Sequence, residues 1–514
     1  MRLSTLVRLS LAGNRTDRLR TALTAASAAL AAVALLAAAA VASIRGGDLI
    51  DDPESLRTRT PGSEHYASAL LAEGGLRPGV IFTILMLALP VLALAGQCIR
   101  LGAPARDRRL AALRLSGATP RQTVLIAGAE TAAASLLGSV IGLGVFAVLR
   151  ATLDPRSADG RLWLPVDVVP DPLLVVGALL LVPLLAGAIG VLLMRRVVIT
   201  PLGVVRRLRE KGPWPWPGVL IGVGLVAFIG PEVLPDDRAA GLPEQAPLYF
   251  MAVGVLLATL GVILGVGWIS YTAGRLLRRY GKGAGTLLAG ARLMADPWNG
   301  SRTLGALLAA IVVGAGTLSF RTMLVTDFEA SARYEEIIEG TDYSGYGSVS
   351  DLGFYLGAIR LLMVAVSIAV AVAAAGVLIA FVEGIVARRR TYAALTATGV
   401  PRRTLTSVLL WHTFVPLIPA LLVALATGAA LFRMTGTEIT LGAPYQQCVD
   451  PNPVSWETCA KETVVPPTLV VPVPIPFADL ALLGGGALAA MLLVVGVCAV
   501  VLRTSADLEE LRVG

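Results

Sequence analysis

Charged residues are scarce in this chain. Lysine, arginine, aspartate and glutamate make up 15% of its 514 residues, whereas hydrophobic residues make up 55% and the mean hydropathy is +0.75. Soluble globular domains carry about 25% charged residues, so this balance excludes a chain of ordinary soluble domains. We expect an all-α polytopic membrane protein instead, because helices satisfy their backbone hydrogen bonds internally within the bilayer.

Enzyme motifs are missing as well. Gly281-Lys282-Gly283 has neither the spacing nor the hydroxyl of a Gly-x-x-x-x-Gly-Lys-Ser/Thr phosphate loop, and no serine elbow occurs. The two histidines, His65 and His412, have no ligand partners at a suitable spacing. We therefore expect a chain that is not an enzyme and that binds no metal and no cofactor of its own.

Long apolar runs are plentiful. Windows near the length of about 20 residues that crosses a bilayer occur about ten times, at 22–44, 80–99, 124–149, 173–194, 219–230, 248–272, 304–320, 361–386, 408–432 and 480–502. The window 219–230 is short and needs the preceding Trp214, Trp216 and Pro217 to span. The first window exceeds the apolar core of about 7 to 15 residues in a signal peptide, so we interpret it as a retained helix.

Arginine and lysine gather in alternate segments, which predicts the topology. The basic segments are 2–20, 106–121, 195–211, 275–302 and 388–403, whereas 48–54 and 327–342 are acidic. The positive-inside rule places the basic segments and both termini in the cytoplasm. The same rule explains the formal net charge of +8 without a nucleic-acid partner. Short outer loops at 45–79 and 321–357 leave no room for a large external domain.

One basic stretch occurs twice. Residues 106–123 read RDRRLAALRLSGATPRQT and residues 388–405 read RRRTYAALTATGVPRRTL. Aligning Gly117 with Gly399, 282 positions later, also aligns Leu113 with Leu395. The preserved offset predicts a tandem duplication. We divide the chain into a first four-span repeat (1–196), a two-span linker (197–280) at the periphery, and a second, parallel four-span repeat (281–514).

The repeated stretch has the chemistry of a short helix followed by a turn. Gly117 provides a C-cap without a Cβ penalty, and Pro120 suits the first turn of the next span. An exposed apolar edge rimmed with arginines favours a protein partner, although a plain inter-helix turn is the alternative. Two further segments, 1–20 and 287–294, have the pattern of helices lying in the cytoplasmic interface, although an ordinary basic tail is the alternative for the first.

The pattern Ala-Leu-x-x-x-Gly-Ala-x-x-x-Gln at 112–122, with the intramembrane Glu130 after it, resembles the permease domain of the FtsX-like (MacB-type) ABC transporter family. In that family the loop between the second and third spans is a coupling helix that fits a groove in the ATPase. The resemblance implies ATPase-docking residues in both copies: Arg108, Arg109, Leu113, Arg114, Gly117, Ala118, Arg390, Leu395, Gly399 and Val400. The second copy departs from the first, with Val400-Pro401 in place of Ala118-Thr119 and no glutamine.

The resemblance also implies a function. The chain would be the membrane subunit of a bacterial plasma-membrane exporter, with two copies of a separate ATPase that bind ATP and magnesium. Its substrates would be amphipathic or lipophilic, such as a peptide antibiotic, a lipid or a drug. One alternative is a non-transporting scaffold that transmits the ATPase state to a cell-envelope enzyme or sensor. Another, an ion-coupled transporter, predicts several interior charges, whereas we find mainly Glu130.

Three polar or reactive features remain. Glu130 corresponds to His412 in the second repeat, and we expect the carboxylate to hold its helix against neighbours, with a proton relay as the alternative. Cys448 and Cys459 share an outer loop in an oxidising compartment, which predicts a disulfide. The valine- and proline-rich run 464–476 predicts an extended lid over the mouth between the repeats.

Overall fold

The computed structural model describes residues 15–47, 49–52, 55–59, 64–81, 83–85, 117, 119–153, 156, 160–198, 212–230, 246–338, 352–387, 394, 396–442, 444–448 and 461–505. The helices are α2 (Arg15–Ala42), α3 (Ala69–Ala72), α6 (Pro120–Thr152), α7 (Pro172–Val198), α8 (Pro217–Phe228), α11 (Ala246–Tyr280), α12 (Ala284–Ala295), α13 (Trp298–Ile338), α14 (Leu352–Ala387), α16 (Arg402–Arg433) and α17 (Phe477–Ser505), with a 3-10 turn η1 (Gly74–Leu76).

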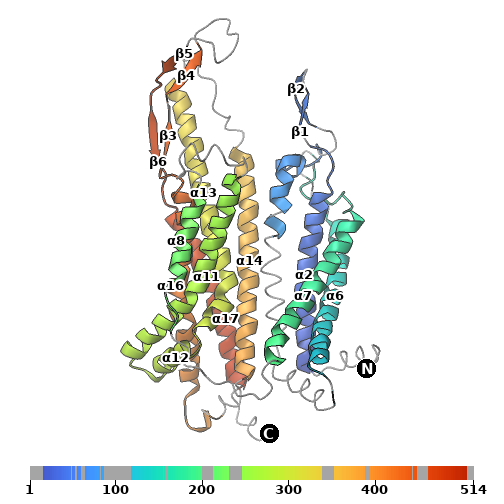
Figure 1. The fold of residues 1–514 in the computed structure, drawn as a ribbon, viewed down its shortest axis with the longest axis vertical. Coiled ribbons are helices and arrows are strands. Elements are labelled where there is room, and N and C mark those ends of the chain that lie inside the picture. Colours follow the sequence, from blue (N-terminus) through green and yellow to red (C-terminus); the bar gives the residue numbers. More distant parts are fainter. Residues whose placement is uncertain are drawn as a thin grey trace.

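The described residues contain six short strands in three separate antiparallel pairs. They are β1 (Leu49–Asp52) with β2 (Ser55–Arg59), β3 (Glu438–Leu441) with β6 (Leu469–Pro472), and β4 (Tyr445–Cys448) with β5 (Lys461–Val464). All of them lie at one end of the helical bundle (Figure 1). In the described part of the chain, the strands therefore lie in the loops and the body of the bundle is helical.

The multi-pass helical architecture expected from hydropathy is confirmed. Seven helices of the described part of the chain are long and apolar enough to cross a membrane: α2, α6, α11, α13, α14, α16 and α17. Shorter apolar helical stretches occur in α7 and α8. Nine of the ten predicted windows lie on helices. The window 80–99 is described only as far as residue 85, so the count of ten stays a prediction.

Helix α8 has 12 residues and is too short to cross a bilayer alone. The segment that precedes α8 continues the chain alongside α11. A Cβ on Gly212 would touch the ring of Tyr271, and one on Gly230 would touch Phe250. Residues 212–230 thus run beside the part of α11 from Tyr271 to Phe250, a helical length of roughly 30 Å. Trp214 and Trp216 lie in this segment, and their predicted role in helping it to span stays a prediction.

The first half of the bundle is α2, α6 and α7 (Figure 1), and glycines hold α2 and α6 together. A Cβ on Gly138 would lie 2.2 Å from the carbonyl oxygen of Ala25, and one on Gly142 would lie 2.6 Å from that of Ala29. Small residues four apart let two backbones approach closely, which is how membrane helices associate without a hydrophobic driving force. Gly138 and Gly142 therefore make the close approach to α2, whereas Gly144 has nothing within 4 Å.

The second half has one continuous core that includes the linker. Phe228 of α8 and Ala258, Val262 and Val266 of α11 share a cluster with residues of α13, α14, α16 and α17. The expectation of a peripheral linker is therefore wrong for α11, because its apolar face supplies part of this core. The two halves meet where Val372 of α14 packs against Ala28, Ala31 and Val182.

Helix α13 projects far beyond its predicted span. It has 41 residues, about 60 Å of helix, so the loop expected from residue 321 onward is helical as far as Ile338. The reason is packing: Ala330 and Tyr334 are buried against Leu441 of β3 and neighbouring residues of β3 and β6. The run 464–476 is extended as predicted, but its strand β6 packs on α13, so the position predicted for it, over the mouth between the halves, is wrong.

Replacing Gly138 with valine should destabilise the first half, because its side chain meets the backbone of α2. Overpacking of this kind costs about 1 to 3 kcal/mol. The measurement is thermal unfolding of the purified chain in detergent by tryptophan fluorescence. Gly144→Val on the same helix, where a side chain meets nothing within 4 Å, is the matched control. Equal melting temperatures for the two variants would contradict the close α2–α6 contact.

Candidate functional site: matching turns at one end of the bundle

Helices α6 and α16 begin at the same end of the bundle, where α11 and α17 end (Figure 1). We call it the basic end, because Arg121, Arg275, Arg278 and Arg403 belong to these terminal turns. The end that carries the strands is called the strand end. One helix-opening turn lies in each half of the bundle, which is the arrangement that the duplication predicts.

The first turn is built around Gly117. This residue is exposed and has φ of 95°, a left-handed conformation that only glycine adopts without strain. Two residues later Thr119 caps α6: the Gln122 amide donates to Thr119 Oγ1 at 3.3 Å, and the Thr119 amide donates to Gln122 Oε1 at 3.0 Å. Pro120 is the first helical residue. This capping box fixes the direction in which the chain enters α6.

The second turn has the same backbone and different side chains. Gly399 is exposed with φ of 91°, and its amide donates to the Thr396 carbonyl at 3.1 Å, which closes a short helical turn. Pro401 occupies the N-cap of α16 without a side-chain cap hydrogen bond. Val400 packs against the main core of the second half. Where the first turn has the capping box of Thr119 and Gln122, the second turn thus has Val400, an apolar anchor packed on the core.

Most of the other docking residues implied by the resemblance lie outside the described residues. They are Arg108, Arg109, Leu113, Arg114, Ala118, Arg390 and Leu395. Their role stays a prediction, and only the two glycines and Val400 have a described geometry. Both glycines have the left-handed conformation that the C-cap prediction requires.

Glu130 and His412 lie at equivalent depths in α6 and α16, and both are half-buried. His412 lines a cavity of about 20 Å³ together with Ser270, Asp296, Asn299, Thr303 and Thr413. That volume holds about one water molecule. The cavity joins α11, the elbow between α12 and α13, and α16. That Glu130 holds α6 against the neighbouring helices stays a prediction.

The disulfide prediction is also untested, since Cys459 lies outside the described residues. Cys448 is the last residue of β4, where the ladder pairs it with Lys461 of β5. Cys498 is fully buried in α17, where its thiol packs as a small apolar side chain.

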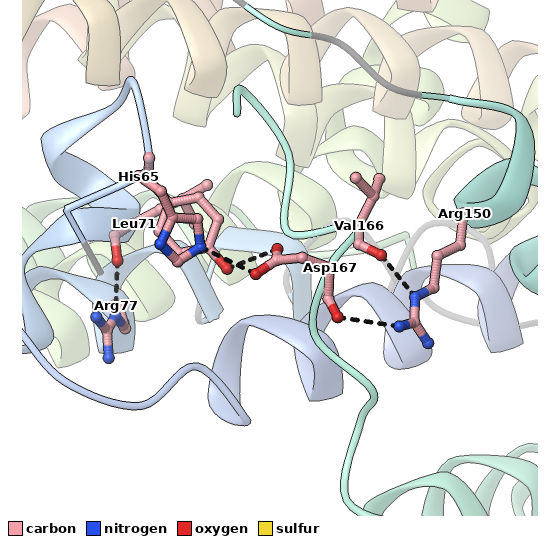
Figure 2. Close-up of polar contacts among 7 residues, drawn as sticks. His65, Leu71, Arg77, Arg150, Val166 and Asp167 are labelled. Atoms are coloured by element: carbon pink, nitrogen blue, oxygen red, sulfur yellow. Dashed lines mark hydrogen bonds and ion pairs between the residues drawn. The ribbon is translucent and has the colours of Figure 1, made fainter. Parts of the chain in front are cut away.

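A polar cluster at the strand end was not predicted from the sequence. We call His65, Tyr66, Arg150 and Asp167 the latch. Tyr66 donates its hydroxyl to Asp167 Oδ1 at 2.9 Å, and His65 Nε2 lies 2.9 Å from Asp167 Oδ2 (Figure 2). Arg150 at the end of α6 donates to the carbonyls of Val166 and Asp167 at 2.7 and 3.1 Å. The latch ties the loop after α2 to the loop between α6 and α7.

Burial and backbone contacts support the latch. Tyr66 is 2% exposed, in a small core with Val41, Ile44 and Leu71. The amide of Ala67 donates to the Leu162 carbonyl, and the amide of Leu162 donates to the His65 carbonyl, both at 2.8 Å. Arg77, 6% exposed, donates to the carbonyl of Leu71 (Figure 2) and also to that of Ile44. The loops at the strand end of the first half are therefore packed and hydrogen-bonded to one another.

Burial and hydrogen bonds within the latch shift the pKa values of Tyr66 and Asp167. Burial, followed by the hydrogen bond to Asp167, raises the pKa of Tyr66 above its ordinary value of 10.0. Burial alone would raise the pKa of Asp167, but the hydrogen bonds from Tyr66 and His65 outweigh it and lower this pKa below 3.8. The Asp167 carboxylate is therefore an ionised acceptor at neutral pH.

Replacing Asp167 with asparagine should weaken the latch above pH 3.8. A lowered folded-state pKa contributes stability that is present above the unfolded value and is lost as the pH falls through the folded value. We expect a loss of about 1 kcal/mol at pH 7, small because the pair is partly exposed. Unfolding of the two proteins compared between pH 3 and 7 checks this, with Glu64→Gln as an exposed neighbouring control. A difference that persists unchanged below the folded pKa would contradict the assignment.

The chain was also compared with known proteins. A family model described as FtsX-like permease C-terminal matches residues 79–201 and 363–506, slightly more than half of the chain. The two segments begin near the second predicted span of each repeat, which is consistent with a duplication. A comparison with curated proteins gave no match. With paired turns opening α6 and α16 and a family model matching both repeats, the chain belongs to the FtsX-like permease family.

Proposed function

We propose that this chain couples ATP hydrolysis by a separate ATPase to the export or extraction of an amphipathic or lipophilic substrate. Family membership supports the coarser statement, that the chain is the membrane subunit of an ABC-type transporter system. The observation that carries the coupling proposal is the pair of exposed left-handed glycine turns, Gly117 and Gly399, at the same end of the two halves. Each is followed within three residues by a long membrane helix.

A docked ATPase would move these helices directly. Helix α6 begins at Pro120, shortly after Gly117, and Pro401 caps α16 shortly after Gly399. So short a connection has little freedom to absorb a displacement. Closure of an ATPase pair would therefore shift α6 and α16 between two arrangements, with one arrangement favoured when ATP is bound.

Contacts beyond the turns give the movement a route to the strand end. Helix α6 is joined to α2 at Gly138 and Gly142. Helix α16 is joined to α13 in the same way, since a Cβ on Gly428 would lie 2.3 Å from the Val312 carbonyl oxygen. Because α13 continues to the strands β3 and β6, a shift of α16 would reach the outer surface through one rigid helix.

The positive-inside pattern supports a cytoplasmic basic end, as docking of an intracellular ATPase requires. Two matching turns support two ATPase copies for each chain. The substrate class is supported by the family resemblance, and the cavity at His412, with room for about one water, is too small to hold such a substrate. We therefore place the substrate path at the lipid-facing surface or between the halves.

One observation favours the scaffold as a second candidate. The projecting part of α13, residues 321–338, and the strands packed on it form a larger outer structure than the sequence predicted. Such a surface suits a cell-envelope enzyme or sensor that reads the ATPase state. Transport assays with reconstituted chain and ATPase separate the two candidates, because the scaffold moves no substrate.

Gly117→Trp and Gly399→Trp should each reduce co-purification of the partner ATPase. A side chain in the left-handed region costs about 1 to 2 kcal/mol, and the bulky indole blocks approach to the turn, so we expect at least about a five-fold loss. The measurement is a pull-down in detergent with quantified ATPase.

The matched control is Gly160→Trp. Gly160 is exposed, has φ of 76° and has open space around its Cα, but it lies in the loop between α6 and α7 at the strand end. This variant should retain ATPase as wild type does. If all three variants retain it equally while staying monodisperse, the two turns are not the docking site.

A further inference from the structure

Helix α12 is apolar on both of its faces. Its buried face is Gly285, Ala289, Gly290 and Leu293. The residues on the opposite face are all exposed, and Leu287 and Leu288 are 43% and 49% exposed; the full stripe is Ala284, Leu287, Leu288, Ala291 and Ala295. A helix with an exposed stripe that has no polar residue is stable at a lipid interface and unfavourable in water.

The buried face fixes α12 firmly to its neighbours. A Cβ on Gly290 would lie 2.9 Å from the Gly274 carbonyl oxygen of α11, and one on Gly285 would lie 2.9 Å from Ser407 Oγ of α16. Ala289 shares a small core with Leu277 and Val408. Since these elements lie this close, the exposed stripe is held in one orientation beside the lower ends of α11 and α16 (Figure 1).

Positive charge gathers beside the stripe, and one exposed carboxylate, Asp296, follows directly after α12. Between residues 246 and 295 the sequence contains no aspartate and no glutamate, and its five cations all fall at the end of α11 and in or just before α12: Arg275, Arg278, Arg279, Lys282 and Arg292. The first four are exposed. Two of them lie over tyrosine rings, Arg275 over Tyr271 and Arg279 over Tyr280, each at 5.6 Å from the ring centroid.

Tyrosines and arginines at the end of a spanning helix are typical of the level of the lipid headgroups. Tyr280 is exposed at the end of a helix long enough to span, where aromatic side chains prefer the membrane interface. Guanidinium groups stacked beside such rings are suited to contact lipid phosphates. Exposed leucines next to them are suited to contact the upper part of an acyl chain. Together they match the two parts of a phospholipid with a negative headgroup.

We propose that the end of α11 and the exposed face of α12 form a binding site for an anionic phospholipid. Arg278, Arg279 and Lys282 take the headgroup phosphate, and Leu287 and Leu288 take the upper acyl chain. The site is separate from the two glycine turns, and it does not depend on the proposed transport activity. It contacts α16 through α12, so the bound lipid lies one helix away from the span that begins just after Gly399.

The test is a titration of the purified chain, in a neutral detergent, with fluorescently labelled phosphatidylglycerol. Phosphatidylcholine with the same acyl chains is the neutral probe. We expect phosphatidylglycerol to bind at least about ten-fold more tightly, and its affinity to fall with added salt. Equal binding of the two lipids would overturn the proposal.

Two double variants locate the site. Arg278→Gln/Arg279→Gln should weaken phosphatidylglycerol binding by about ten-fold, whereas Arg161→Gln/Arg333→Gln removes the same charge from the strand end and should leave it unchanged. Equal binding in both variants would overturn the proposal. Leu287→Gln/Leu288→Gln should weaken the binding of both lipids. Unchanged binding in this variant would show that these leucines do not contact the acyl chain.

Two further controls distinguish a lipid site from a soluble-phosphate site and from a protein-docking site. Glycerol phosphate, which has the headgroup charge without acyl chains, should not displace the labelled lipid at millimolar concentration; if it does, the site binds soluble phosphates and the lipid assignment is wrong. ATPase co-purification should be unchanged in Arg278→Gln/Arg279→Gln. Loss of ATPase in that variant would show that these arginines dock protein instead of lipid.

Discussion

Close contact between helix backbones is the constraint on which this molecule depends. Within a bilayer, apolar side chains gain little by leaving lipid for one another, so packing and backbone approach must hold helices together. Gly138 and Gly142 meet α2, Gly428 meets α13, and Gly224 and Gly254 join α8 to α11, each at distances that a Cβ would block. The helices that open at the two turns are thereby fixed to partners that reach the other end of the bundle.

Local chemistry made part of this predictable. The left-handed glycines 117 and 399 and the start of α6 at Pro120 follow from residue types at short spacing, and the helical spans follow from hydropathy. The projection of α13 was missed because residues 321–338 carry charges that end an apolar window, while the contacts that keep them helical come from β3 and β6, about 100 positions or more later. The latch joins His65 to Asp167, 102 positions apart, and no local pattern shows such a pair.

The described membrane helices of the two halves correspond to one another, whereas the structures around them differ. At the strand end the first half is closed by loops and a tyrosine, whereas the second half extends a helix that carries strands. The turns differ too, with a capping box before α6 and an apolar anchor before α16. The linker helix α11 was not predictable as core from the sequence, since residues 200–280 match neither repeat and therefore have no counterpart to indicate a partner.

The length of α13 makes it a lever. Its 41 residues are continuous from the elbow after α12 to the strands. A tilt of about 5° about its inner end would carry its outer tip sideways by about 5 Å, given a helix of about 60 Å. A rearrangement of a few degrees among packed helices is thus magnified, at a distance from the membrane, into a displacement that exceeds the diameter of a water molecule.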